Sequence, residues 1–367
     1  MKRAPMLLLS LLLIANLALA ACGPGDSAEP QEAAREGIVI EDALGRTVEF
    51  AQLPQRIVVA GKSSLTIVDT LFLFPEAAER VAGLVVGKQN PGEFLRFVDP
   101  TFDEKSVLQV ESGPEQIAPL EPDVVILRSF MAETLGKSLE QIEIPVVYLD
   151  LETPEQYFRD LDTLATLLGN EARAVEIHSF YQARLERLDA AFEGLGDDQK
   201  PRVVLLQHSE QGGEVALNVP SASWLQTIEA ELAGGIPVWK DAAQGGGWTI
   251  VNFEQIAAWD PDTILLVSYG ADPSQVVEGL QADARWQALR AVKEGRLYAF
   301  PGDIFSWDQP DPRWILGVTW MASKMHAERL PDLDLMDEVY QFFGQMYGME
   351  QNAITEKLLP ALKGDWR

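Results

Sequence analysis

A helical pattern of apolar residues runs through residues 170–195. The apolar side chains recur at steps of three and four positions, with charged side chains between them: Ile177, Tyr181, Leu185, Leu188, Phe192 and Leu195. This spacing places them on one face of an α-helix, and neither Pro nor Gly interrupts the segment before Gly194. At a rise of 1.5 Å per residue, we expect one continuous helix of roughly 35 Å.

Two similar segments lie on either side of this predicted helix. Seven of thirteen positions are identical between residues 115–127 and residues 254–266, including Glu-Gln-Ile-Ala and Pro-Asp. Each segment predicts a short helix, a turn at Pro-Asp and a continuous apolar strand of the kind buried in a parallel sheet. We therefore expect two α/β lobes of one design, at residues 38–153 and 196–367, joined by helices at residues 154–195.

Further apolar runs complete both predicted lobes. Strands are expected at residues 57–60, 81–86, 124–127, 146–149, 203–207, 263–267 and 297–300. A small hairpin around Leu44 and Gly45 precedes them, residues 88–97 read as a polar loop, and Thr153 with Pro154 forms a helix start. The predicted fold class is α/β, with mostly parallel sheets flanked by helices and a ligand cleft between the lobes.

The first residues carry a pattern typical of an export signal. Lys2 and Arg3 precede an apolar run at residues 6–19 that is too short to span a membrane comfortably. The run ends at Leu-Ala-Ala-Cys, the pattern at which bacterial lipoprotein precursors are cleaved, and Cys22 is the only cysteine. The alternative is a chance thiol after a general secretory signal.

We predict a signal peptide at residues 1–21, a lipid on Cys22 and a flexible tether at residues 22–37 that is rich in Gly, Pro, Ser and acids. The expected location is the bacterial cell envelope, outside the cytoplasm, with the lipid as the only membrane attachment. The formal charge of −27 argues against nucleic acid as a partner. We expect a soluble, monomeric body.

Candidate ligand contacts follow from the rule that open parallel sheets bind ligands at the carboxyl ends of their strands. In the first lobe this rule selects Lys62, Ser63, Ser64, Arg128 and Ser129. In the second lobe it selects His208, Trp248, Ser268, Tyr269, Phe305, Trp307 and Asp308. Cationic and hydroxyl groups suit an anion, and aromatic walls suit a bulky, partly apolar ligand. A metal chelate with acidic groups would satisfy both.

Each candidate also has a purely structural interpretation. Lys62 or Arg128 can pair with a nearby surface acid, and Trp248 can be exposed in the loop that carries three consecutive glycines. Tyr269 and Trp307 can be ordinary contacts between lobes. A lone His208 is more often a hydrogen-bonded histidine than a metal ligand.

Sequence motifs of enzymes are missing. Gly61-Lys62-Ser63 resembles the end of a Walker A loop, but Arg56 stands where that loop needs its first glycine. Gly-x-Ser-x-Gly and His-Glu-x-x-His do not occur. With three histidines in the chain, a bare transition-metal site built from several of them is not expected. We predict neither catalysis nor a resident metal or cofactor.

The lipoprotein pattern, residues 42–48, the two Glu-Gln-Ile-Ala segments and residues 313–322 resemble the helix-linked (class III) binding proteins of ABC importers. These proteins carry iron siderophores, haem, cobalamin and, in some members, molybdate or tungstate. The resemblance covers residues 38 to about 359. It implies two lobes around a rigid helix, modest closure on the ligand, and delivery to an ABC permease and its ATPase. It also implies permease-docking acids, for which Glu231, Glu104 and Glu111 are the candidates.

The resemblance leaves the ligand open. A siderophore-type iron chelate ranks first, because Lys62 and Arg128 would combine with the tryptophans. Haem would need an axial ligand such as His208 or Tyr269, and cobalamin would use the aromatic walls. Molybdate or tungstate would need only small donors, which are Lys62, Ser63, Ser64 and Arg128. A sensor or adhesin without transport, or an extracytoplasmic enzyme, are alternatives of other classes.

Overall fold

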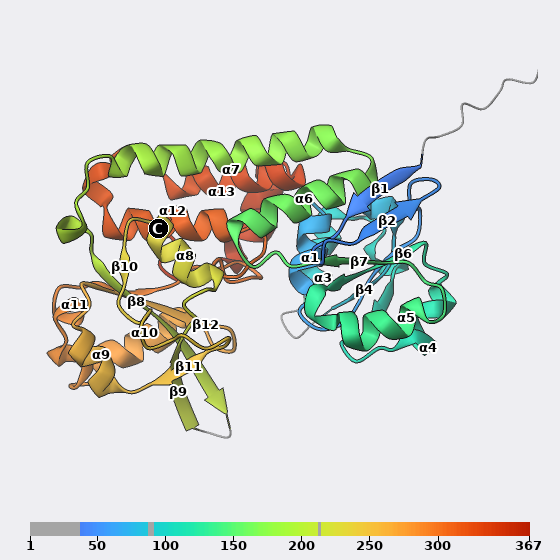
Figure 1. Cartoon of the computed structure of the whole chain (residues 1–367). Helices are drawn as coiled ribbons and strands as arrows, with labels where there is room; N and C mark the ends of the chain where they lie inside the picture. The colour runs from blue at the N-terminus through green and yellow to red at the C-terminus, as the bar shows by residue number, and fades with distance from the viewer. Residues whose placement is uncertain (1–36, 87–91, 212–213) are drawn as a thin grey trace, which may run out of the picture. The chain divides into compact units, whose positions relative to one another are not determined.

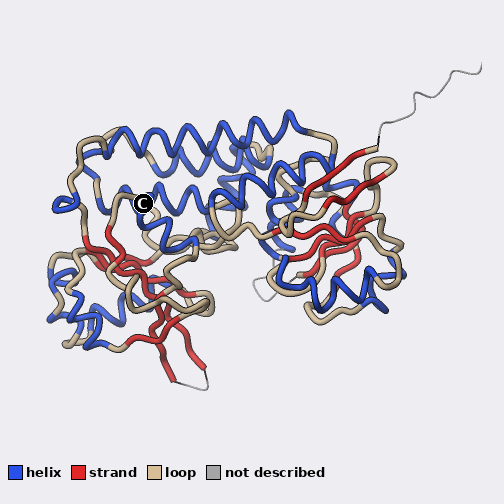
Figure 2. The backbone as a smooth tube through the Cα atoms, viewed as in Figure 1, coloured by secondary structure: helices blue, strands red, loops and turns tan. Residues whose placement is uncertain are grey.

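The computed structural model describes residues 37–86, 92–211 and 214–367 (Figure 1). The predicted signal peptide, Cys22 and nearly all of the predicted tether lie outside the described residues. Among the residues that are described, no helix is both long and apolar enough to cross a membrane. The strands gather in two separate main sheets, each with helices beside it (Figure 2). The expected α/β fold class is confirmed.

The N-terminal lobe is built on a five-stranded, wholly parallel sheet in the order β5-β4-β3-β6-β7. Its strands are β3 (Ile57–Val59), β4 (Val81–Val85), β5 (Ser106–Leu108), β6 (Val124–Arg128) and β7 (Val146–Leu149). Its helices are α1 (Leu65–Leu71), α2 (Ala77–Arg80), α3 (Gly92–Val98), α4 (Pro114–Ile117) and α5 (Lys137–Glu140). Short turns of 3-10 or π helix are η1 (Phe102–Glu104), η2 (Ala118–Leu120), η3 (Ser129–Met131) and η4 (Ala132–Gly136). The central strands are buried on both faces because their residues are continuously apolar.

The expected hairpin precedes this sheet. Strand β1 (Ile38–Glu41) pairs antiparallel with β2 (Thr47–Phe50). Gly45 lies in the turn at a φ of 72°, a left-handed conformation that glycine adopts without strain. Asp42 accepts hydrogen bonds from the backbone amides of Leu44 and Arg46, which fixes the turn.

The C-terminal lobe has a six-stranded mixed sheet in the order β11-β9-β8-β12-β13, with β10 also paired to β8. Its strands are β8 (Arg202–Gln211), β9 (Glu214–Val219), β10 (Ile236–Pro237), β11 (Thr249–Val251), β12 (Thr263–Ser268) and β13 (Leu297–Ala299). Its helices are α8 (Leu225–Leu232), α9 (Phe253–Trp259), α10 (Pro273–Ala282), α11 (Arg290–Lys293), α12 (Trp314–Met325), α13 (Leu335–Tyr347) and α14 (Gln351–Ala353). Shorter helical turns are η5 (Asp197–Gln199), η6 (Trp286–Ala288), η7 (Ala327–Arg329), η8 (Ile354–Leu358) and η9 (Leu359–Ala361).

Two helices connect the lobes. Helix α6 (Pro154–Leu168) begins as predicted, with the Thr153 hydroxyl accepting the N–H of Gln156 at 3.3 Å. Gly169, at a φ of 68°, ends α6, and Asn170 caps the second helix. This helix, α7 (Glu171–Phe192), is the predicted long helix, and it ends at Phe192 rather than Leu195. Figure 1 shows α7 beside α12 and α13, and Arg184 of α7 pairs with Glu338 of α13 at 2.8 Å.

Two local predictions were wrong. Residues 88–97 were expected to form a polar loop, but α3 occupies residues 92–98 and buries Phe94 and Leu95 completely. The strand expected to end at Gln207 continues to Gln211. It continues because β9 supplies an antiparallel partner, from Gln207 opposite Asn218 to Gln211 opposite Glu214.

The two repeated segments share the conformation of the turn that precedes their strands. At their seventh positions, Glu121 and Asp260 adopt left-handed φ values of 48° and 41°. Two positions later, an aspartate carboxylate accepts backbone N–H groups at the start of the neighbouring strand. Asp123 accepts from Arg56 at 2.9 Å, and Asp262 accepts from Arg202 at 2.7 Å. Each aspartate thus fastens the first strand of its main sheet, β3 or β8, to the strand at the end of the repeat, β6 or β12.

Strand order fixes where a ligand can enter each lobe. In the N-terminal lobe the chain goes from β3 to β4 and β5 on one side and returns to β6 on the other side. In the C-terminal lobe β10 and β12 likewise lie on opposite sides of β8. Such reversals leave a crevice at the carboxyl ends of the strands. The crevices lie after β3 and β6, and after β8 and β12.

Candidate functional site

Residues from both lobes line one cavity of about 350 Å³ at these strand ends. Ser63, Ser64, Arg128, Trp248 and Tyr269, all predicted ligand contacts, are among its lining residues. The others are Leu65, Thr66, Val85, Val110, Glu152, Gln226, Gln309 and Pro310. The volume is at the lower end of the range for small-molecule sites. We call this space the interlobe cavity.

The hydroxyl side of the cavity comes from the turn after β3. Gly61 and Ser63 have positive φ values of 81° and 54°, so the chain reverses sharply between β3 and α1. This turn leaves Ser63 exposed and Ser64 buried at the cavity. Lys62 is exposed in the same turn but does not line the interlobe cavity.

Arg128 supplies the positive charge of the cavity from the end of β6. Its side chain is 2% exposed, and Nη1 donates to the Thr66 hydroxyl at 3.0 Å. Nη2 forms an ion pair with Glu152, which follows β7 and whose side chain is 41% exposed. Nε is buried and has no hydrogen-bond partner among the described residues. The described lining residues therefore include one cation, Arg128, and one anion, Glu152.

The aromatic side of the cavity comes from the C-terminal lobe. Trp248 packs edge-on against Trp224, with ring centroids 5.6 Å apart, and against Tyr269 at 6.3 Å. The Tyr269 hydroxyl donates to Asp308 at 2.5 Å, and the Gln226 amide reaches the same carboxylate oxygen at 3.4 Å. Asp308 therefore positions two lining residues without lining the cavity itself.

Buried acids lie behind this aromatic side. Glu229 is fully buried, and neither of its carboxyl oxygens has a hydrogen-bond partner within the described part of the chain. Burial, and then the charges of Asp308 and Asp311, raise the pKa of Glu229 well above its usual range. Burial also raises the pKa of Asp308 and of Asp311. These carboxyl groups hold protons more tightly than exposed acids do.

The lobes are also joined by a buried ion network centred on Arg313. Its guanidinium pairs with Asp69 of α1 and, at 2.7 Å, with Asp303 of the C-terminal lobe. All three side chains are almost completely buried. Burial raises the pKa of Asp69 to about 6, although the Arg313 charge acts in the opposite direction. Arg313 contacts the faces of Phe94 and Phe305 at 4.5 and 4.7 Å.

Three predicted contacts lie elsewhere. Phe305 and Trp307 are 1% and 0% exposed, because the loop that holds them folds around Asp303, which accepts the Trp307 indole N–H at 3.1 Å. His208 lies within the extended β8 and lines a groove beside β9 and α10. Of the remaining candidates, Ser129 donates to Asp150, and Ser268 lines a neighbouring polar cavity. In the described part of the chain, no group of three or more His, Cys, Asp or Glu could hold a metal ion.

The candidate docking acids lie on the surface. Glu231, at the end of α8, forms an exposed ion pair with Lys240. Glu104 precedes β5, whereas Glu111 follows it and is adjacent to Val110 of the interlobe cavity. Both N-terminal candidates are exposed.

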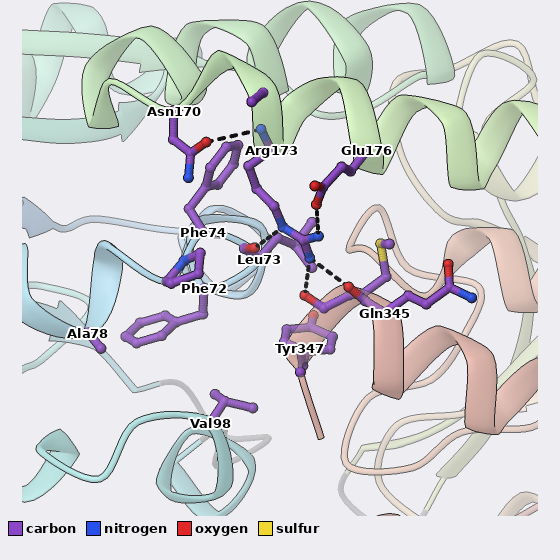
Figure 3. Close-up of a pocket in the computed structure, with 14 residues that line it drawn as sticks. Phe72, Leu73, Phe74, Ala78, Val98, Asn170, Arg173, Glu176, Gln345 and Tyr347 are labelled. Atoms are coloured by element: carbon purple, nitrogen blue, oxygen red, sulfur yellow. Dashed lines mark hydrogen bonds and ion pairs between the residues drawn. The ribbon is translucent and has the colours of Figure 1, made fainter. Parts of the chain in front are cut away.

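A second cavity, of about 470 Å³, lies beside the connecting helix (Figure 3). Arg173 of α7 occupies it and donates to the backbone carbonyls of Leu73 at 2.9 Å, Gln345 at 2.8 Å and Met346 at 2.7 Å. Its remaining edge pairs with Glu176. These contacts use four of the five N–H donors of Arg173 and balance its charge with Glu176, so Arg173 ties α7 to the segment after α1 and to α13.

Comparison with known proteins identifies the family. A family model described as periplasmic binding protein matches residues 98–304, which is more than half of the chain. The chain belongs to the periplasmic binding protein family. As members of this family do, the protein acts outside the cytoplasm as the substrate-binding component of an ABC transporter, and it is not an enzyme.

Relatives of this periplasmic binding protein are named for different ligands. It is 24% identical to the molybdate-binding protein MolA of Haemophilus influenzae, over 84% of this chain and 90% of the relative. It is 25% identical to an iron-uptake system-binding protein of Bacillus subtilis, over 81% and 90%. A vitamin B12-binding protein of Pectobacterium carotovorum is also 25% identical, over 70% and 87%.

Solved structures of other binding proteins share the fold. An ABC transporter solute-binding protein from Sulfurospirillum deleyianum matches with a TM-score of 0.70 at 22% identity, over 87% of this chain and 98% of that chain. Molybdate-bound MolA matches with a TM-score of 0.67 at 20% identity, over 85% and 98%. These likenesses confirm the helix-linked architecture of this periplasmic binding protein.

Sequence reasoning missed several lining residues. Glu152 follows a parallel strand, β7, so the strand-end rule that selected Arg128 could also have found it. Gln226 lies near the start of α8, where no sequence signal separates it from residues of an ordinary amphipathic helix. Thr66 lies inside α1, and its contact with Arg128 arises because the fold brings α1 next to the end of β6, which the sequence alone does not show.

Proposed function

We propose that this binding protein captures a siderophore-type iron chelate and delivers it to an ABC permease and its ATPase. The observation that carries the proposal is the pairing, across one cavity, of a buried arginine with an aromatic wall. Arg128 suits an acidic group of the chelate. Trp248 and Tyr269 suit its flat or apolar parts.

The positions of the other candidates favour a chelate over haem. An axial haem ligand would need a free side-chain donor at the cavity. The Tyr269 hydroxyl is already held by Asp308, and His208 faces a separate groove. One relative is named for vitamin B12, a corrinoid. A corrinoid is less favoured here, because Phe305 and Trp307, which would have extended the aromatic wall of the cavity, are buried in the core.

A small oxyanion is the second candidate. The hydroxyls of Ser63, Ser64 and Thr66 lie around the same cavity as Arg128, and hydroxyl and guanidinium donors suit molybdate or tungstate. The name of the Haemophilus influenzae relative supports this alternative. The aromatic wall would then have no direct ligand contact.

We further propose that a lipid on Cys22 holds the protein at the membrane, and that Glu231 and one acid of the N-terminal lobe dock onto basic residues of the permease. Glu111 is the better N-terminal candidate, because it lies beside the cavity mouth whereas Glu104 lies at the opposite end of β5. Such ion pairs set the orientation and rate of docking more than its affinity.

Native mass spectrometry of the purified protein tests the ligand. We would offer ferric siderophores, haem, cobalamin and tungstate to the wild type and to Trp248→Ala. We expect a ferric siderophore to bind and Trp248→Ala to weaken it by more than about 1 kcal/mol, since an aromatic wall would be lost. Tight binding of tungstate alone, unaffected by Trp248→Ala, would show the oxyanion to be the ligand. An equal truncation at Trp259, which is partly buried and lies outside the interlobe cavity, is the control.

A further inference from the structure

The two members of the ion pair in the interlobe cavity differ in how deeply they are buried. Arg128 is almost completely buried and anchored by Thr66, whereas the side chain of its partner Glu152 is 41% exposed and lies on the connection between β7 and α6. Arg128 therefore has a fixed position, and Glu152 can turn into solvent without breaking the core. One member of the pair can leave and the other cannot.

Glu152 also leaves one N–H donor of Arg128 without a hydrogen-bond partner among the described residues. Nε and Nη2 lie on the same edge of a guanidinium, where two oxygens of one group can bind side by side. Glu152 engages Nη2 through a single oxygen, and Nε of that edge has no partner among the described residues. A buried donor left without a partner is unfavourable, because it has lost its hydrogen bonds to water. A ligand group that engages both donors would recover this loss.

We propose that Glu152 is an internal counterion that the ligand displaces, so that an acidic group of the ligand takes over Nε and Nη2 of Arg128. The inference rests on the proposed function and refines it, because it requires a ligand with two oxygens on one atom, either a carboxylate of a chelate or an oxyanion. Glu152 then acts as a specificity residue. It keeps Arg128 neutralised when the cavity is empty and competes with weakly bound anions.

Charge in the cavity supports this exchange. Among the described residues that line the cavity, Arg128 and Glu152 are the only charged ones. When Glu152 turns outward, the cavity gains a positive charge and the ligand brings the balancing negative charge. A neutral chelate would leave the pair intact and gain nothing from Arg128.

Binding selectivity tests the proposal. Isothermal titration would compare ferric citrate, which carries carboxylates, tungstate, which is an oxyanion, and ferrichrome, which is a neutral chelate. We expect Glu152→Gln to tighten ferric citrate or tungstate about tenfold, the scale of one charge-assisted bond, and to leave ferrichrome within twofold. Whichever acidic probe responds identifies the source of the two oxygens.

The matched control is Glu155→Gln, which removes an exposed acid three residues away and outside the cavity. It should leave all three affinities within twofold, and thermal unfolding would show that both variants are folded. If the wild type binds ferric citrate and Glu152→Gln does not change that affinity, or if only ferrichrome binds, the displacement is overturned and the proposed function stands. An unchanged affinity for tungstate likewise overturns the displacement, and binding of tungstate alone shows the ligand to be the oxyanion. If neither these probes nor the wider panel of metal compounds bind the wild type, the proposed function fails and this inference fails with it.

Discussion

The two lobes share a frame and differ in the walls they present to the ligand. In both, an aspartate of the repeated segment, Asp123 or Asp262, holds the backbone at the start of the first strand of the main sheet, β3 or β8. In both, the residue two positions earlier is left-handed. The strand ends differ, because β6 ends in a cation whereas β12 is followed by an aromatic residue backed by buried acids.

This difference distinguishes residues that maintain the fold from residues that contact the ligand. The frame is repeated because each lobe must join two parallel strands in the same geometry. Nothing in that geometry depends on whether Arg128 or Tyr269 follows the strand. The cavity walls are therefore free to vary between lobes and between relatives, which agrees with relatives named for molybdate, iron uptake and vitamin B12.

The largest expected effect comes from removing the buried ion network that joins the two lobes. Arg313→Met would leave Asp69 and Asp303 buried without their cation, and removing one member of a buried ion network costs about 3–5 kcal/mol. Urea unfolding should show a loss of this size. Arg296→Met is the matched control, because Arg296 forms only an exposed pair with Glu294 and should lose less than about 1 kcal/mol. Equal losses for both variants would mean that Arg313 does not join the lobes.

A second test uses the acids that only the C-terminal lobe places behind its wall. Burial raises the pKa of Glu229 in the folded protein, so its stabilising contribution is complete below the ordinary pKa of a glutamate and is lost as pH rises toward the raised value. The unfolding free energy of the wild type should therefore fall as the pH rises above the ordinary pKa of a glutamate, by at most about 1.4 kcal/mol per pH unit for this one proton. Asp308 and Asp311, which face Glu229, act in the same direction.

Glu229→Gln should flatten this slope, and Glu254→Gln, which changes an exposed acid on α9, should not. Urea unfolding of the three proteins at several pH values measures the difference. An unchanged slope in Glu229→Gln would mean that Glu229 is ionised in the folded protein. In that case the buried acids would not distinguish the two lobes.

Sequence periodicity was enough for most of the frame. The steps of apolar residues predicted α7, the Thr153-Pro154 pair predicted the start of α6, and the repeated segments predicted β6 and β12. The prediction failed where a partner distant in sequence decided the outcome. Strand β8 extends past Gln207 because β9 pairs with it, and apolar runs alone do not show such pairing.

The site was predictable only at strand ends. Arg128 and Tyr269 follow strands and do line the cavity, as the strand-end rule requires. Phe305 also follows a strand, but its loop turns back on Asp303 and Arg313, and this turn depends on hydrogen bonds that no periodicity encodes. Gln226 lines the cavity from helix α8, where its side-chain amide is held by Asp308, a residue distant in sequence.

The smallest expected effect tests whether the frame is truly equivalent in the two lobes. Asp123→Ala and Asp262→Ala each remove an acceptor from a strand backbone, and each should cost about 1 kcal/mol of unfolding free energy. Asp262 also pairs with Arg290, but that pair is partly exposed and should add little. Asp189→Ala, at an exposed position on α7, is the control and should stay within about 0.5 kcal/mol of the wild type. A loss at one aspartate without a loss at the other would show that the two segments, although alike in sequence and conformation, hold their lobes in different ways.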